Sequence, residues 1–237
     1  VMSIGKKKKF KRASVEYKAS GAKAIFYRQL LEYKKEKWFI FSYMTLFCIG
    51  ADILFLKVID VSEFGSKSAV LLGIVAYLAI LTGGYLGKWD KELKNPYLFL
   101  LPDSPAKKMW YATVMEHVKA AIDGAILVLP LGIAWKVHPF HMVSCWLIYV
   151  FLQAIKLYTK VLIDSFLRNS LGETVKQLVR LGVQGGIIGI GVLLAVVAVV
   201  LQNFNFAFFV ILIYGMIMAV VIGLLTVSRF AIMEQYD

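Results

Sequence analysis

Six long runs of apolar residues dominate the chain, with short polar connections between them. The runs cover 38–56, 68–87, 115–137, 140–163, 185–201 and 206–227. At a helical rise of 1.5 Å per residue, the 19 residues of the first run reach roughly 28 Å, about the thickness of a bilayer's hydrocarbon core. The pattern therefore predicts an all-α, polytopic membrane protein whose domain over 38–237 has six transmembrane helices.

The residues ahead of the first run mix charged and apolar side chains at helical spacing. Within 22–37, Phe26, Leu30 and Tyr33 follow one another at intervals of four and three, which places them on one stripe of a helix. The stripe predicts an amphipathic helix on the cytosolic membrane surface, although a helix packed on another domain would have the same pattern. Residues 1–21 are rich in lysine and predict a basic cytosolic linker beside anionic headgroups.

Composition agrees with a membrane protein and sets its orientation. Apolar residues make up 59 % and charged residues 18 %, against about half and a quarter in ordinary globular proteins. The formal net charge is +12, but twelve of the 27 lysines and arginines precede residue 38, so they favour a membrane surface over nucleic acid. Connections 88–111 and 168–180 are basic, whereas 138–141 and 202–205 hold no Lys or Arg. The positive-inside rule then predicts that both termini and the two basic connections are cytosolic.

Sequence motifs of catalysis are absent from the chain. It has no P-loop, no H-E-x-x-H and no G-x-S-x-G, so we do not expect it to be an enzyme by itself. His138 and His141 flank Pro139 in a short turn, where two histidines alone make a poor metal site and a polar external turn is the simpler interpretation. We therefore predict no catalytic residue, no metal and no cofactor bound by this chain.

The connection 88–111 contains a short apolar patch between two prolines. A short helix before it and a rigid turn after it would make a surface suited to a partner, with the apolar side chains as anchor and the charges fixing the register. Folding of the patch back on the bundle or the headgroups is the alternative. The candidate docking residues are Asp90, Glu92, Leu93, Pro96, Leu98, Phe99, Leu100, Leu101, Pro102, Asp103 and Ser104.

Two stretches, AKAIFYRQLLEYKK at 22–35 and WDKELKNPYLFLLPDSPAKKMWY at 89–111, resemble the family of bacterial permeases described as Putative ABC exporter. Members of that family carry two six-span halves, and this chain resembles the C-terminal one. The resemblance implies a permease half in the bacterial cell membrane, with residues 22–37 as connecting helix and 90–108 docking on a separate ABC ATPase subunit that binds ATP and Mg. It also implies a second six-span half, on the same polypeptide or another chain.

Charged residues within or beside the apolar runs form a second candidate site. Each would cost about 2.5–3.5 kcal/mol if it faced lipid, so we expect them to face the bundle interior. The candidates for a translocation pathway or gate are Asp52, Lys119, Asp123, Lys156, Lys160 and Asp164. Counting residues inward from the turn between the third and fourth runs predicts that Asp123 and Lys156 lie level and interact. Snorkelling lysines and one structural ion pair would be the alternative.

Glycines recur at helical spacing where the fifth apolar run begins. Gly182 and Gly186, and Gly185 and Gly189, each follow a G-x-x-x-G pattern, which lets helices approach closely. We predict from them close packing within the bundle.

The leading interpretation is the transmembrane permease half of an exporter, which couples ATP hydrolysis in a partner subunit to substrate translocation. A non-transporting membrane scaffold or immunity-type protein with the same docking connection is the main alternative, and an intramembrane enzyme is a weaker one.

Overall fold

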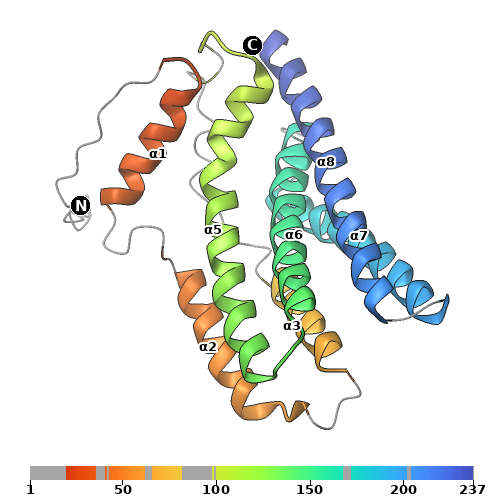
Figure 1. Ribbon diagram of the computed structural model, residues 1–237. Helices are drawn as coiled ribbons and strands as arrows, with labels where there is room; N and C mark the ends of the chain where they lie inside the picture. Colours follow the sequence, from red (N-terminus) through yellow and green to blue (C-terminus); the bar gives the residue numbers. More distant parts are fainter. Residues whose placement is uncertain are drawn as a thin grey trace, which may run out of the picture.

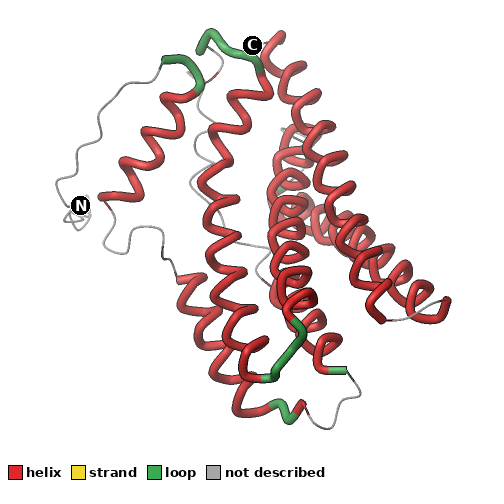
Figure 2. Tube along the Cα trace, in the orientation of Figure 1, coloured by secondary structure: helices red, strands yellow, loops and turns green. Residues whose placement is uncertain are grey.

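The structure, a computed structural model, is built from helices (Figures 1 and 2). It describes residues 20–35, 41, 43–61, 66–81, 98, 100–167, 172–201 and 204–236. The helices are α1 (Lys23–Lys35), α2 (Tyr43–Val58), α3 (Lys67–Leu81), α5 (Pro105–Ala134), α6 (Pro139–Phe166), α7 (Glu173–Leu201) and α8 (Phe204–Tyr236). Every regular element among these residues is a helix, in agreement with the predicted all-α class.

Four of the helices are long and apolar enough to cross a membrane: α5, α6, α7 and α8. They cover the fourth to sixth predicted spans and all but the last three residues of the third. Helices α2 and α3 overlap the first two predicted spans, and their described parts are 16 and 15 residues long. At 1.5 Å per residue these reach about 24 and 22 Å, short of a hydrocarbon core of about 30 Å. The described residues therefore bear out four spans, and a count of six is not established.

Helix α6 is the centre of the bundle. It packs against α3, α5, α7 and α8, while α1 and α2 pack on α5. One apolar core joins α3, α5 and α6 around Leu71, Leu127 and Tyr149, and a second joins α6 and α8 around Tyr158 and Ile222. Helices α3 and α5 therefore pack on α6 in one core, and α8 packs on α6 in the other. Helix α7 contacts α6 and α8.

Helices α5 and α7 begin well before their apolar runs. Pro105 occupies the first turn of α5 after Ser104, the position in which proline costs a helix no hydrogen bond. Helix α5 therefore starts ten residues ahead of the predicted span, and α7 starts at Glu173, twelve residues ahead. The connections at this end of the bundle are correspondingly shorter than the sequence suggested.

The turn between α5 and α6 is tight and uses a left-handed residue. Helix α5 ends at Ala134, and Lys136 has φ 54°. The Val137 backbone N–H donates to the Gly132 carbonyl at 2.9 Å and that of Lys136 to the Ile133 carbonyl at 3.1 Å, which completes a Schellman motif. The apolar run 115–137 was predicted to stay helical throughout, so the turn begins three residues earlier than expected.

Helix α1 packs lengthwise on the first half of α5. Gln29 Nε2 donates to the Ala112 carbonyl at 2.8 Å, and the Tyr33 hydroxyl to Glu116 Oε1 at 3.0 Å. The buried stripe is Ile25, Gln29 and Tyr33, so only Tyr33 belongs to the stripe that the sequence singled out. The described residues thus show a helix packed on the bundle, and an amphipathic helix lying on the membrane surface is not confirmed.

Among the described residues, no neighbouring helix lies against the glycines at the start of the fifth apolar run. A Cβ atom added at Gly182, Gly185, Gly186 or Gly189 would meet no heavy atom within 4 Å beyond the helix's own backbone. The prediction of close packing there is wrong. Close approach occurs instead at Gly124 of α5, where an added Cβ would lie 2.7 Å from a ring carbon of Tyr149 on α6.

Candidate functional site

Two of the charges predicted in the spans have partners from neighbouring helices. The Thr45 hydroxyl on α2 donates to Asp123 Oδ1 on α5 at 2.6 Å, and both side chains are buried. Lys156 of α6 donates to the Ala79 carbonyl on α3 and, at 3.3 Å, to Gln153 Oε1. Polar groups inside the bundle therefore join α2 to α5 and α3 to α6.

The predicted pair of Asp123 with Lys156 is wrong, because the two residues contact different helices. The contact of Gly124 with Tyr149 places Asp123 level with residues near 149 on the antiparallel α6. Lys156 lies seven residues further along α6, roughly 10 Å away along the axis. The depth arithmetic failed because α5 ends at Ala134, so the turn takes up residues that had been counted as helix.

The other predicted pathway residues divide between the interior and the end of the bundle. Asp52, Lys119 and Lys160 are buried, at 6 %, 7 % and 8 % exposure. Oδ1 of Asp52 has no hydrogen-bond partner among the described residues. Asp164, at the end of α6, accepts from Arg180 of α7 at 2.6 Å, which forms an ion pair that the sequence did not predict.

The candidate docking segment covers residues 90–104, and its described part has both buried and exposed side chains. Leu98 is 3 % exposed and packs with apolar residues of α1, α5 and α8, whereas Leu100 is 77 % exposed. Leu101 packs partly on the same cluster, and Pro102 and Ser104 are exposed. Asp90, Glu92, Leu93, Pro96 and Phe99 lie outside the described residues. Folding back on the bundle is thus correct for Leu98, while Leu100 is available to a partner.

Asp103 ties this segment to α1. Its Oδ2 accepts the backbone N–H of Ala22 at 2.7 Å, just ahead of the first residue of α1. A carboxylate at that position satisfies a backbone donor that the helix leaves unpaired and interacts well with the helix dipole. Gly21 has φ 63°, and a Cβ there would lie 2.1 Å from Asp103 Oδ2, so the close approach requires glycine. The docking segment and α1 therefore meet at one joint.

Histidine 141 joins three helices at the opposite end of the bundle. Its Nδ1 hydrogen-bonds the Ser68 hydroxyl of α3 at 2.8 Å, and its Nε2 hydrogen-bonds Asn205 Oδ1 of α8 at 2.8 Å. The ring also stacks on Phe208 with centroids 4.5 Å apart. His138, in contrast, caps α6 by accepting the Phe140 backbone N–H at 3.3 Å. The two histidines thus have separate structural roles that the sequence did not reveal.

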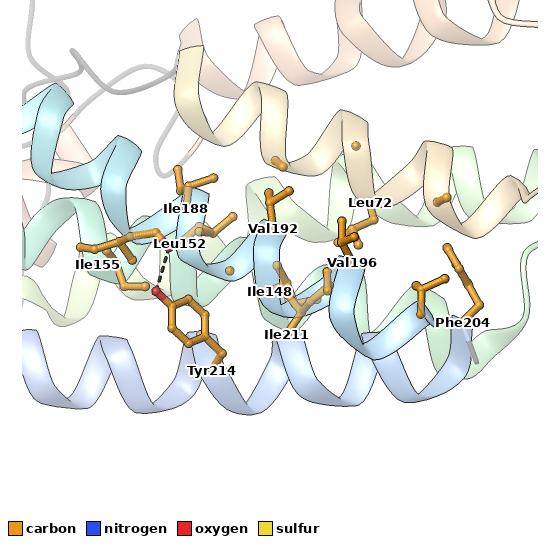
Figure 3. Close-up of a pocket in the computed structure, with 18 of the residues that line it drawn as sticks. Leu72, Ile148, Leu152, Ile155, Ile188, Val192, Val196, Phe204, Ile211 and Tyr214 are labelled. Atoms are coloured by element: carbon orange, nitrogen blue, oxygen red, sulfur yellow. Dashed lines mark hydrogen bonds between the residues drawn. The ribbon is translucent and has the colours of Figure 1, made fainter. Parts of the chain in front are cut away.

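An apolar groove of about 420 Å³ lies between α3, α6, α7 and α8 (Figure 3). Figure 3 shows side chains of these helices, among them Leu72, Ile148, Val192 and Ile211, around the groove. Tyr214 lines it with its ring, and its hydroxyl donates to the Ile187 carbonyl at 2.8 Å. Such a volume is within the range of small-molecule sites. Sequence reasoning missed the groove because apolar runs do not reveal where neighbouring helices diverge.

A family model described as Putative ABC exporter matches residues 2–234. The chain belongs to this family. No curated protein and no solved structure matches it. Together with the four long apolar helices, membership identifies a membrane protein related to transport. Three features of this family member bear on transport: the candidate docking segment, the charges within the bundle and the apolar groove.

Proposed function

We propose that the chain is a transmembrane permease half that couples ATP hydrolysis in a separate ABC ATPase subunit to export of a substrate. Family membership supports transport in general. The observation that favours coupling is the joint at which the docking segment contacts α1, together with the packing of the same segment on α5 and α8. The ATPase supplies ATP and Mg binding, and a second six-span half completes the pathway, on the same polypeptide or another chain.

The joint brings one side of the docking segment into contact with three helices at once. Leu98 packs with Ala22, Ile25, Ala112 and Phe230, from the start of α1, from α5 and from the end of α8. In Figure 1 the loop ahead of α5 and the last turns of α8 lie together at one end of the bundle. A push on the segment would therefore move the ends of these helices together, which is what alternating access requires of a coupling element.

The proposed orientation puts this end in the cytosol of a bacterial cell, together with both termini. The basic connections 88–111 and 168–180 support it through the positive-inside rule. The turn at the opposite end, Trp135 to His138, has a single lysine, Lys136, and no arginine. The charged residues Asp52, Lys119, Asp123, Lys156, Lys160 and Asp164 are proposed to border the pathway or its gate, because an inert bundle has little reason to keep them within or beside its apolar helices.

Leu98 and Leu100 provide a matched test of coupling, because they are the same residue type on opposite faces of one segment. Leu100→Ser should leave the melting temperature in detergent unchanged, since the side chain is 77 % exposed. It should weaken capture of the ATPase subunit by about 1 kcal/mol, roughly fivefold, as expected for one apolar contact at an interface.

Leu98→Ser is the control for folding. It removes a side chain that is 3 % exposed and should lower the melting temperature while ATPase capture falls only with the folded fraction. If Leu100→Ser binds the ATPase as well as the parent chain does, the assignment of this segment as the docking surface is wrong. A chain that folds normally and never co-purifies with an ATPase subunit would instead favour the membrane scaffold.

A further inference from the structure

We propose that the groove between α3, α6, α7 and α8 binds one acyl chain of an anionic amphiphile. This names the substrate class of the export function proposed above and so rests on it. The hydrocarbon chain would lie in the groove, parallel to the helices. The charged headgroup would lie near the cations of α6, at the end of the groove toward the docking segment, which we call its inner end.

The dimensions of the groove select a single chain. Its lining extends along α7 from Ile187 to Val200, fourteen residues that rise by about 20 Å. A volume of 420 Å³ over that length leaves a mean cross-section of about 21 Å². A helix about 10–12 Å across needs roughly four to five times that area, so the groove cannot enclose a whole helix. One extended hydrocarbon chain matches the groove in both volume and length.

The chemistry of the lining selects hydrocarbon. All nineteen lining residues except Tyr214 are aliphatic, glycine or phenylalanine. The Tyr214 hydroxyl already donates to the Ile187 carbonyl, so no lining side chain offers the ligand an unused polar group. The groove also runs along the apolar stretches of α7 and α8, where lipid chains run in the same direction. A water-soluble cargo would lose its hydration there without gaining hydrogen bonds.

Charge at one end fixes the direction of the ligand. Ile155 lines the inner part of the groove, and the next residue, Lys156, reaches across to α3 at Ala79. Ala79 is one helical turn beyond Ala76, the last lining residue of α3. Lys160 follows one turn later on α6 and is also buried. The ammonium group of Lys156 at this end, with Lys160 one turn further along α6, favours an anionic headgroup over a neutral one.

Glycine 73 offers a way to close the groove without distorting the bundle. A Cβ at Gly73 would meet nothing within 4 Å, so Gly73→Phe can place its ring in the groove. Gly50 of α2 is equally open but does not line the groove, so Gly50→Phe is the matched control. Both changes replace a helical glycine by the same side chain, and any general effect on the helix cancels.

The experiment uses the purified chain in lipid nanodiscs, without an ATPase, and a palmitic acid that carries a diazirine near the end of its chain. Peptide mapping after irradiation should find the label on the groove residues of α3 and α7. Gly73→Phe should reduce that labelling about fivefold or more, and Gly50→Phe should not. Hexadecyl phosphate should compete at roughly fivefold lower concentration than hexadecanol, and Lys156→Gln should remove the difference, the size expected for one partly screened ion pair.

Equal labelling of the groove in the two phenylalanine variants would overturn the proposal, as would labelling spread evenly over all lipid-facing surfaces. Equal competition by the phosphate and the alcohol in the parent chain would overturn the anionic headgroup and with it the stated substrate class. Because no ATPase takes part, these failures are distinct from a failure of coupling, which only the Leu100 experiment measures.

Discussion

The inner pair of long helices, α5 and α6, differs from the outer pair, α7 and α8, in how much of each helix the protein itself covers. In their most apolar 18-residue stretches, 44 % of α5 and 39 % of α6 is buried, against 17 % in both α7 and α8. The outer helices are also the more apolar. A helix surrounded by lipid has to be apolar on every side, whereas a helix surrounded by other helices can keep polar side chains whose partners the neighbours provide.

The partners of the buried charges follow this division. Asp123 and Lys156 lie on the inner helices, and each takes a hydrogen-bond partner from a short helix, α2 or α3, that covers it. The polar residues of α7 are concentrated in its first turns, where Arg180 pairs with Asp164. Substitutions at matched positions of the two pairs therefore test whether coverage by protein determines what each helix tolerates.

The largest difference is expected between two glycines. Gly124→Leu on α5 would drive a side chain into Tyr149 and Trp146, whose nearest atoms lie 2.7 and 3.2 Å from the added Cβ. Overpacking of this kind costs about 1–3 kcal/mol, and the added branches put this case at the upper end. A Cβ at the exposed Gly189 of α7 would meet no described heavy atom within 4 Å, so Gly189→Leu should change the free energy of unfolding by less than about 0.5 kcal/mol. Steric trapping in bicelles measures both, and equal effects would contradict the comparison.

Much of this arrangement was predictable from apolar periodicity, and the rest depends on contacts between helices. The runs at 140–163 and 206–227 predicted α6 and α8. The register of α5 against α6 was not predictable, because it depends on a turn in which Lys136 adopts a left-handed conformation that nothing in the run 115–137 indicates. An error of three residues there was enough to assign Asp123 the wrong partner.

The sequence did not predict which side of the amphipathic helix is buried either. The stripe of Phe26, Leu30 and Tyr33 fits both a membrane surface and a protein neighbour, and only the hydrogen bonds of Gln29 and Tyr33 to α5 decide between them. The groove depends on how far α3 and α7 lie apart, a property that no local pattern contains. Sequence thus predicted the helices better than the sites that lie between them.

The second difference concerns two threonines. Thr45→Val removes the donor that Asp123 receives across the α2–α5 contact, and should cost about 1–2 kcal/mol because a buried carboxyl loses its partner. Thr226→Val on α8 removes a hydroxyl that bonds the Ile222 carbonyl of its own helix at 2.7 Å and the Tyr158 carbonyl at 3.1 Å. Both acceptors are helix carbonyls, so we expect a loss below about 0.6 kcal/mol. The same unfolding assay applies, and a larger loss for Thr226→Val would reverse the ranking.

The smallest effect is expected at Tyr214, the hydrogen bond that joins the outer helices to each other. Its hydroxyl donates to the Ile187 carbonyl of α7 at 2.8 Å, and Tyr214→Phe removes that bond while the ring stays in place. Hydrogen bonds between membrane helices average about 0.6 kcal/mol, and the Ile187 carbonyl keeps its place in the α7 helix, so the free energy of unfolding should fall by no more than that. Tyr214→Ala is the control, since it also removes the ring that Gly191 approaches, and it should cost clearly more. If Tyr214→Phe alone cost as much as Thr45→Val, the outer pair would depend on polar contacts as strongly as the inner pair does, and coverage by protein would no longer explain the difference between them.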